Sequence, residues 1–388
     1  METRMGARLT GALMGAATLL LAAGTAGAAD VKLPDTMAWT AYDTGSAGHA
    51  HAVAMGKAFK EKYGVNLRVL PGKNDVSRLR PLQAGKVEAV ANGVGTYFAQ
   101  EGVFGFDKPD WGPQPIRIVM SSTGGAGLMV GVAGDIGVKE YKDLKGKRVA
   151  WVKAAPALNH NVTAFLAFAG LTWDDVEKVE FAGFGASWEG MTNNQVDAAF
   201  AISNSGATKA VAASPRGLLW PPLPFSDTAG WTRLKELAPY MNQHKVSAGT
   251  NIDKASPIEG MAYPYPILTV RTDAADDLIY NITKAVVESF DGYKDGAPGA
   301  AGWDLKNQAF EWAVPYHDGA VKYFKEIGVW TDAMQKHNDG LVKRQGVLQD
   351  AWATFTKDAP SDEAAFLEGW GKARVAALKG AGMKPVIE

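Results

Sequence analysis

Hydrophobic and polar positions follow two alternating patterns along the chain. Short runs of apolar and β-branched residues, typical of buried strands, are separated by stretches with apolar side chains at helical spacing. The first region predicts strands at 37–42, 67–70 and 87–90, with helices that follow Gly48 and Asn74. Strands that alternate with helices are the pattern of a parallel sheet, so we expect an α/β unit here.

The same alternation returns after residue 148. It predicts strands at 148–151, 178–181, 198–201 and 218–220, and helices at 158–169, 187–193 and 205–213. Residues 240–266 are rich in Pro, Gly and Ser and are predicted to be irregular, and a strand at 267–271 returns to the first unit. The remainder is predicted to be helical, at 274–290, 317–327, 331–355 and 361–378.

The stretch 128–151 stands between the two α/β units. It opens with an apolar strand at 128–132 and ends with Gly146 and a new strand. We interpret it as the crossing and hinge between two lobes, and we expect 116–120 and 128–132 to form an exposed hairpin. The predicted lobes are 29–130 with 267–388, and 131–266, with a ligand cleft between them.

The first 28 residues have the features of a cleaved signal peptide. Arg4 and Arg8 give a positive start, an apolar run covers 9–23, and Ala26 and Ala28 supply an A-x-A cleavage pattern. The alternative is a membrane anchor, but the run is short and contains several Gly and Thr. We therefore expect a mature protein that is exported to a periplasm or its equivalent.

Composition narrows the classes of function. A chain of 388 residues with 47% hydrophobic content can bury two cores. A formal net charge of −1 provides no basic field for nucleic acid, and the absence of cysteine excludes thiol catalysis and Cys-based metal sites. We find no H-E-x-x-H, P-loop or G-x-S-x-G motif, and we predict no catalytic residue, cofactor or metal and a monomeric chain.

Six short segments carry motifs whose spacing is more specific than these general patterns. They are 42–48 (Y-D-T-G-S-A-G), 75–91, 143–149 (D-L-K-G-K-R-V), 181–185, 195–200 (Q-V-D-A-A-F) and 316–328 (Y-H-D-G-A-V-K-Y-F-K-E-I-G). Together they resemble the TAXI family of TRAP-transporter solute receptors, and 316–328 is the most specific match. The resemblance implies a type II periplasmic-binding fold. It also implies that the protein delivers a small organic solute to membrane-embedded TRAP permease subunits.

Two loops depart from that family. His49-Ala50-His51 stands where the family usually has Tyr or Pro-type residues, and 153–159 replaces a Gly/Ser/Thr-rich loop. Both loops are expected to contact ligand, so the glutamate-like or dicarboxylate ligands of some relatives are not carried over.

Ligands of open parallel sheets bind at the carboxyl ends of strands, near helix N-termini. The predicted strand ends lie at 43–49, 72–75, 92–96, 153–159, 184–188 and 203–206. From these ends and the return strand we predict the ligand-binding residues Thr44, Gly45, Ser46, His49, Asn74, Asp75, Asn92, Thr96, Trp151, Pro156, Asn159, Trp188, Asn204, Tyr263 and Tyr265.

Several of these residues have structural alternatives. Helix capping explains Ser46, Asn74, Asp75 and Asn92 about as well as ligand binding does. Trp151 and Trp188 could instead be core residues. His49 and His51 would diverge on a helix, so joint metal binding is not expected, and His51 is interpreted as a surface or packing residue.

The sequence shows no clearly placed arginine for a carboxylate ligand. Arg78 and Arg80 follow Asn74 in a predicted helix, and a helical surface is their expected location. This favours a ligand with an aromatic or weakly polar body whose acid group is held by backbone amides.

Three other functions compete with the TRAP receptor. The turn 43–46 (D-T-G-S) matches the aspartic-hydrolase turn, but that chemistry needs two carboxylates and no second D-T-G occurs. A receptor for an ATP-driven importer or a sensor would have the same fold. A purely structural periplasmic protein would bind no ligand.

Overall fold

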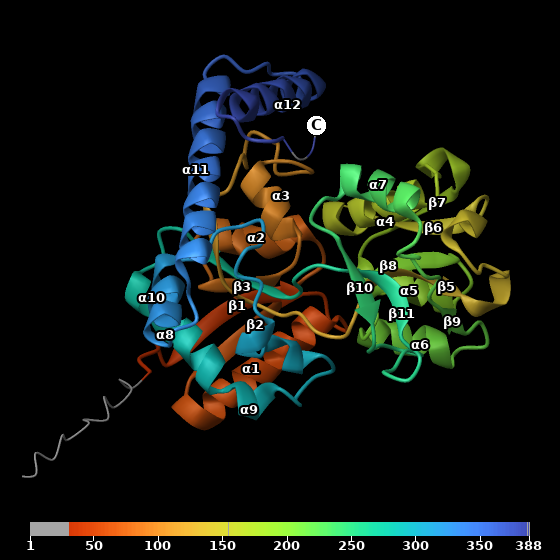
Figure 1. Cartoon of the computed structure of the whole chain (residues 1–388), viewed down its shortest axis with the longest axis horizontal. Helices are drawn as coiled ribbons and strands as arrows, with labels where there is room; N and C mark the ends of the chain where they lie inside the picture. Colours follow the sequence, from red (N-terminus) through yellow and green to blue (C-terminus); the bar gives the residue numbers. More distant parts are fainter. Residues whose placement is uncertain (1–30, 154, 386, 388) are drawn as a thin grey trace, which may run out of the picture. The chain divides into compact units, whose positions relative to one another are not determined.

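The computed structural model describes residues 31–153, 155–385 and 387. The predicted signal peptide lies outside the described residues. Between Val31 and the C-terminal end, the described chain contains two five-stranded sheets and one two-stranded ribbon, with helices packed around them (Figure 1). Among these residues, no helix is both long enough and apolar enough to cross a membrane.

The first sheet has the strand order β2-β1-β3-β12-β4. Its strands are β1 (Thr36–Tyr42), β2 (Asn66–Gly72), β3 (Ala89–Asn92), β4 (Ile116–Ser121) and β12 (Ile267–Arg271). β1 pairs in parallel with β2 and β3, whereas β12 runs antiparallel between β3 and β4. All four residues of β3 are buried, as expected for a strand covered on both faces of its sheet.

The second sheet has the order β7-β6-β8-β5-β9. Its strands are β5 (Leu128–Ala133), β6 (Arg148–Val152), β7 (Glu177–Phe181), β8 (Ala198–Ile202) and β9 (Leu218–Leu219). β5 runs antiparallel to β8, in the position that β12 occupies in the first sheet. The two sheets therefore share one topology. The antiparallel strand comes late in the chain in the first sheet (β12) and early in the second (β5).

Helices connect and cover the strands. Those of the first sheet are α1 (Ala47–Tyr63), α2 (Asp75–Gln83), α3 (Gly95–Glu101), α8 (Asp276–Glu288), α9 (Phe290–Tyr293) and α10 (Asp318–Glu326). Those of the second sheet are α4 (Pro156–Phe168), α5 (Phe184–Thr192), α6 (Gly206–Ala213) and α7 (Thr228–Leu237). Short 3-10 turns occur at η1 (Gly134–Ile136), η2 (Tyr141–Leu144), η3 (Trp173–Asp175), η4 (Ala300–Trp303) and η5 (Leu305–Asn307).

The chain passes between the sheets at different places from those expected. β4 and β5 do not form a hairpin, because β4 pairs with β12 in the first sheet and β5 pairs with β8 in the second. The expected hairpin is wrong, and so is the crossing within 128–151, since β5 and β6 belong to the same sheet. Residues 122–127 make the first crossing, and 263–266 make the return.

The stretch predicted to be irregular contains a ribbon of two antiparallel strands. These are β10 (Asn242–Val246) and β11 (Ile258–Ala262), which pair over five residues each. The Pro, Gly and Ser residues around them obscured the strands, because pairing across a long loop leaves little local pattern. Helix α7, which precedes the ribbon, was also not predicted.

The motif at 316–328 builds the packing of α10 on α8. His317 caps α10, its Nδ1 accepting a hydrogen bond from the backbone N–H of Gly319 at 3.1 Å. A methyl group at Gly319 would lie 2.3 Å from the carbonyl oxygen of Asp276 at the start of α8, so only glycine permits this approach. The specificity of this motif therefore has a structural cause.

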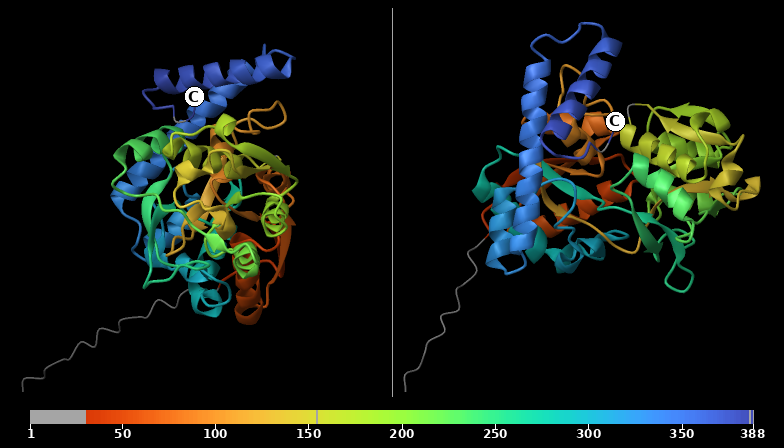
Figure 2. Two further views of the ribbon diagram at one scale, coloured as in Figure 1. Left: turned by 90° about the vertical axis from the view of Figure 1, so that its right-hand side faces the viewer. Right: turned by 45° about the horizontal axis from the view of Figure 1, so that its top comes forward.

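Two long helices, α11 (Asp332–Phe355) and α12 (Glu363–Gly380), complete the chain (Figure 2). They pack on each other through aromatic rings, including Trp352 and Trp370 with centroids 4.8 Å apart. Both helices are tied to the end of α3 by Glu101, whose carboxylate binds Arg344 at 2.7 Å and Arg374 at 2.5 Å. Glu101 is fully buried, so this ion-pair cluster fixes the helical pair to the first sheet.

Candidate functional site

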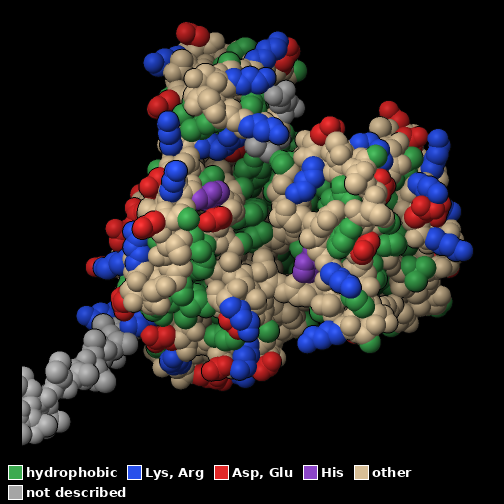
Figure 3. Space-filling model, viewed as in Figure 1, with side chains coloured by type: hydrophobic (Ala, Val, Ile, Leu, Met, Phe, Trp, Pro, Cys, Tyr) green, Lys and Arg blue, Asp and Glu red, His purple; other side chains and the backbone are tan. Residues whose placement is uncertain are grey.

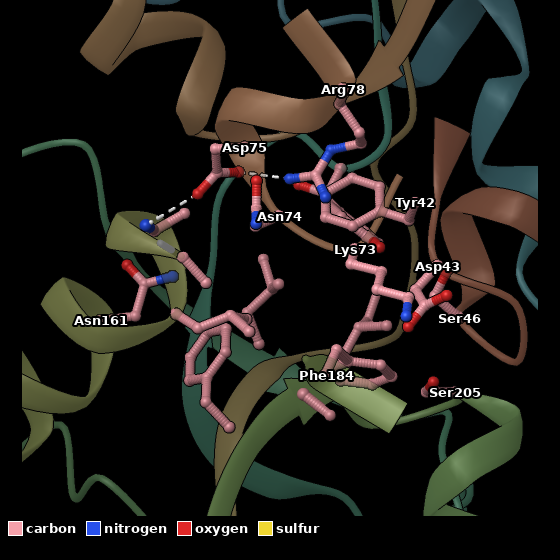
Figure 4. Close-up of a pocket in the computed structure, with 18 of the residues that line it drawn as sticks. Tyr42, Asp43, Ser46, Lys73, Asn74, Asp75, Arg78, Asn161, Phe184 and Ser205 are labelled. Atoms are coloured by element: carbon pink, nitrogen blue, oxygen red, sulfur yellow. Dashed lines mark hydrogen bonds and ion pairs between the residues drawn. The ribbon is translucent and has the colours of Figure 1, made fainter. Parts of the chain in front are cut away.

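A cavity lies where strand ends of both sheets face one another (Figure 4). Its lining comes from Tyr42, Asp43, Ser46, Lys73, Asn74, Asp75, Arg78, Leu128, Ala155, Ala157, Leu158, Asn161, Phe184, Phe200, Ala201, Ile202, Ser205, Tyr263 and Tyr265. The space between these side chains, including the part open to solvent, is about 550 Å³. Small-molecule sites commonly occupy about 300–1,000 Å³, and this space falls within that range.

The starts of several helices converge on this cavity. Ser46 caps α1, its Oγ accepting from the N–H of His49 at 3.2 Å, and Asn74 caps α2 in a capping box with Ser77. Helices α4, α5 and α6 begin at Pro156, Phe184 and Gly206, beside the lining of the second sheet. Helix N-termini and strand carboxyl ends favour polar and anionic groups, so the geometry suits recognition of a small polar solute.

Arg78 is the buried cation of the cavity, with 3% of its surface exposed. Its Nε donates to Asn92 Oδ1 at 3.1 Å and its Nη1 to the carbonyl of Gly72 at 3.3 Å. The guanidinium carbon lies 3.7 Å from the centroid of the Tyr42 ring. The expected position of Arg78 on a helical surface is therefore wrong, and the cavity does hold a fixed arginine.

Asp75 is the buried anion, with 1% of its surface exposed, and it contacts both sheets' elements. Its Oδ1 pairs with Arg78 Nη2 within α2, and its Oδ2 accepts from the backbone N–H of Ala157 at 3.0 Å, in the first turn of α4 (Figure 4). A carboxylate at a helix N-terminus is stabilised by the unpaired N–H groups there. This single side chain therefore connects the first sheet to the second across the cavity.

Two other hydrogen bonds cross between the same parts of the chain. Ser205 Oγ donates to the carbonyl of Gly45 at 3.2 Å, and Asn204 Nδ2 donates to the carbonyl of Pro298 at 3.1 Å. Figure 3 shows the surface hollowed between the part with α3 and the part with α7, where apolar side chains reach the surface. The two parts also pack directly on each other beside this hollow, where Phe98 of α3 lies edge to face on His160 and Tyr240, with ring centroids 5.6 and 5.8 Å apart.

Tyrosine rings form one wall of the cavity. Tyr42 and Tyr265 pack edge to face with centroids 5.1 Å apart, and Tyr263 accepts a hydrogen bond from Asn161 at 2.7 Å. Burial raises the pKa of Tyr42, Tyr263 and Tyr265 well above the ordinary value, so their hydroxyl groups stay protonated. The rings therefore add neutral hydroxyls and aromatic faces to the site.

A glycine at the end of β3 makes room for this tyrosine wall. A methyl group at Gly93 would lie 2.4 Å from Tyr42 Oη and 3.0 Å from Tyr265 Cδ2. Because Tyr42 stacks on Arg78, the position of the guanidinium depends on this close approach.

Replacing Gly93 with alanine is expected to displace Tyr42 and to weaken solute binding by about ten-fold or more. Isothermal titration calorimetry measures the effect. Gly346→Ala in the middle of α11 is the matched control, since an added methyl group there meets nothing within 4 Å. The control should bind normally and gain roughly 0.5–1 kcal/mol of stability. Equal affinity of Gly93→Ala and the wild type would contradict this role of Gly93.

Five of the residues predicted from sequence line the cavity: Ser46, Asn74, Asp75, Tyr263 and Tyr265. Asn92 and Thr96 lie one layer behind it. Asn92 holds the Arg78 guanidinium and donates to Thr96 Oγ1 at 3.2 Å, and Thr96 in turn bonds Thr269 at 2.9 Å. These two buried side chains can position Arg78.

The structure places the other predicted residues outside the cavity lining. Thr44 and Gly45 lie on the exposed side of their turn, and His49 is half-buried in α1, where burial lowers its pKa. Trp188 is a core residue whose Nε1 donates to the carbonyl of Phe200. The side-chain amide of Asn159 accepts from the backbone N–H of Val152 and donates to its carbonyl.

The remaining three predicted residues lie near other hollows. Trp151 packs against Trp173 and, with Pro156, borders a shallow hollow beside α4. Asn204 lines a larger, more open hollow of about 1340 Å³ that covers both crossings. His51 is a buried packing residue, with Nδ1 accepting from Trp303 and Nε2 bonded to the carbonyl of Pro298.

Sequence reasoning missed most of the apolar wall and its polar rim. Leu128, Leu158, Phe184, Phe200 and Ile202 form the wall. Several of the missed residues fell within the predicted strand ends, namely Asp43, Lys73, Ala155, Ala157, Leu158, Phe184 and Ser205. The predicted strand ends therefore border the cavity, whereas the choice of polar residues within them overlooked the apolar ones.

Comparison with known proteins places the chain in a family. The model of the NMT1-like family matches residues 43–328, about three quarters of the chain. The chain belongs to the NMT1-like family. Residues beyond 328, which include α11 and α12, lie outside that match. The more specific TAXI resemblance is not confirmed by this match.

Solved structures similar to this NMT1-like protein are distant from it. An ancestral arginine-binding protein bound to arginine is 15% identical, covers 68% of this chain and 95% of its own, and has a TM-score of 0.42. The alkanesulfonate-binding protein SsuA from Xanthomonas axonopodis pv. citri bound to MOPS is 13% identical. It covers 83% of this chain and 94% of its own, with a TM-score of 0.40. An ABC transporter/periplasmic binding protein from Brucella ovis with glutathione bound is 12% identical. It covers 66% of this chain and 69% of its own, with a TM-score of 0.42.

The strand orders of the two sheets define the fold of this NMT1-like protein. Each sheet is mostly parallel with one antiparallel strand inserted, and the cavity lies between their strand ends. The fold class is α/β of the type II periplasmic-binding kind, as predicted. Within the described residues, no cluster of three or more His, Asp or Glu side chains is arranged to hold a metal ion.

Proposed function

We propose that the protein captures a small organic solute, an organic acid or a related compound, and delivers it to a membrane transporter. The observation that carries the proposal is the cavity between the two sheets, in which a buried Arg78, helix N-termini and tyrosine hydroxyls face an apolar wall. Sites that orient small molecules combine a mostly apolar lining with a few fixed polar groups.

The proposed mechanism is closure of two lobes around the solute. We propose lobes formed by 31–121 with 267–387, and by 128–262, joined at 122–127 and 263–266. In the part of the chain that the structure describes, two crossings connect them and few hydrogen bonds bridge the cavity, so the empty protein should exchange between open and closed forms. A solute that contacts both lobes favours the closed form by its added binding energy.

We propose that the membrane partner is a TRAP-type permease, and the motifs at 42–48 and 316–328 support this partner. We also propose that the receptor is a monomer and that it acts in the compartment to which it is exported. Transport in vesicles that contain candidate permeases separates the alternatives. Uptake driven by an ion gradient supports a TRAP-type partner, whereas uptake that requires ATP supports a receptor for an ATP-driven importer.

The aspartic-hydrolase alternative has little support from the cavity. Asp43 and Asp75 both line it, but each oxygen of Asp75 already binds another group, Arg78 or the N–H of Ala157. A shared proton between two carboxylates needs them to face each other. Loss of an acid protease activity on Asp43→Ala substitution would revive this alternative.

Mass spectrometry of the protein purified from its native host tests the proposed function. We expect a small organic solute to co-purify, and calorimetry should then give a dissociation constant on the order of micromolar, or about 8 kcal/mol of binding free energy. Failure to bind any small solute would support a structural role instead.

A further inference from the structure

We propose that Asp75 and Arg78 together select a solute that carries an ammonium group and a carboxylate, with no net charge and an apolar body. This inference rests on the proposed function and deepens it by naming the class of solute. Asp75 and Arg78 are buried side chains of opposite charge on one turn of α2, and both line the cavity. Their charges cancel, so the inner end of the cavity has no surplus charge for a simple anion or a simple cation.

A plain acid would meet Asp75 at close range. An added carboxylate that reaches the Arg78 guanidinium also approaches the Asp75 carboxylate paired with it, and like charges in a buried site repel strongly. A solute that brings its own cation avoids this repulsion, because its ammonium group can pair with Asp75 while its carboxylate pairs with Arg78.

Both side chains retain capacity for a solute. Each carboxylate oxygen of Asp75 accepts from one partner, Arg78 or the N–H of Ala157, and each can accept a second hydrogen bond. Three of the five guanidinium hydrogens of Arg78 are used within the described residues, by Asn92, Gly72 and Asp75. An acceptor and a donor therefore lie side by side at the inner end of the cavity.

The other charged groups of the cavity also balance. Lys73 is exposed and Asp43 is partly exposed at its rim, and their charges cancel (Figure 4). The tyrosines are neutral and offer ring faces that attract a cation, and the apolar wall can take up a hydrocarbon side chain. The best match is therefore a zwitterion with an aliphatic or aromatic body.

Two sets of compounds, each with a shared hydrocarbon side chain, test the inference. They are L-leucine, 4-methyl-2-oxopentanoate and isopentylamine, and L-phenylalanine, phenylpyruvate and phenethylamine. In calorimetry at neutral pH, the zwitterion of at least one set should bind about ten-fold or more tightly than its acid and its amine. An acid that binds as tightly as its zwitterion, or no binding in either set below about 1 mM, overturns the inference.

Asp75→Asn removes the charge and keeps one oxygen, which can accept from either Ala157 or Arg78 but not from both as the two carboxylate oxygens do. In this variant the preference should reverse, with the acid gaining affinity and the zwitterion losing about ten-fold or more. Asp110→Asn, an exposed ion-pair partner of Arg80, is the matched control and should keep the wild-type order. Binding of the acid alone to the wild type would refute the selection and leave the proposed function intact. Failure of the co-purified solute to bind would refute the function itself.

Discussion

Replacing Arg78 with alanine is expected to lower the free energy of unfolding by about 3–5 kcal/mol and to abolish solute binding. The substitution leaves the Asp75 carboxylate buried with only the N–H of Ala157 as a partner. It also removes the donors to Asn92 Oδ1 and to the carbonyl of Gly72 and the cation stacked on Tyr42. A buried charge without its partner is among the most costly defects in a folded protein. Urea denaturation monitored by tryptophan fluorescence measures the loss.

Arg80, two residues along the same helix, supplies the control. Its pair with Asp110 lies at the surface, and surface pairs contribute roughly 0–1 kcal/mol. Arg80→Ala should therefore change stability little and leave binding unchanged. Equal effects of the two substitutions would contradict the role of Arg78.

A double variant separates binding from folding. Arg78→Met with Asp75→Leu removes both buried charges, and apolar replacements of a buried pair are often neutral or stabilising. This variant should recover stability without recovering solute binding. Recovery of both would mean that Arg78 contributes only to folding.

Replacing Glu101 with alanine is expected to loosen the C-terminal helices and to cost about 3–5 kcal/mol. Arg344 and Arg374 would both lose their carboxylate, and Arg374 is itself almost completely buried. Limited proteolysis should then cut within α11 or α12 before the rest of the chain. The exposed pair Lys108–Glu363 gives the control, and Glu363→Ala should cost no more than about 1 kcal/mol.

The same cluster predicts a dependence on pH. Burial alone would raise the pKa of Glu101, but hydrogen bonds and charge from Arg344 and Arg374 outweigh burial and lower it. A lowered pKa in the folded state means that the cluster contributes fully above the unfolded value of about 4.3 and loses its contribution as pH falls through the folded value. Glu101→Gln should remove this part of the acid sensitivity. An unchanged stability profile between about pH 5 and pH 2 in that variant would contradict the assignment.

The sequence predicted the α/β architecture because buried parallel strands appear as short apolar runs between helical patterns. Prediction from the sequence failed where strands pair with partners far along the chain. Residues 121–127 are rich in Ser and Gly and look like a hairpin turn, but β4 pairs with β12 and β5 with β8, far along the chain. The ribbon of β10 and β11 was missed because its paired strands are separated by residues 247–257.

The predicted ligand-binding residues and the lining of the cavity overlap in part. The predicted strand ends border the cavity, and Tyr263 and Tyr265, which were predicted because they precede the return strand, line it. Arg78 was placed on a surface because an arginine in a short helix is usually exposed. Asp75 is a local partner in the same helix, but Asn92 comes from β3, so the helix pattern alone does not reveal the burial of Arg78.

A distance measurement between the two lobes tests solute-driven closure most directly. The chain contains no cysteine, so spin labels can be attached at Lys57→Cys in α1 and Lys145→Cys in the second lobe, both exposed positions. Electron–electron double resonance should show a broad distribution of distances without solute. Saturating co-purified solute should narrow it to one shorter distance, and Arg78→Ala should abolish the change. An unchanged distribution under solute that calorimetry shows to be bound would contradict capture by closure of the lobes.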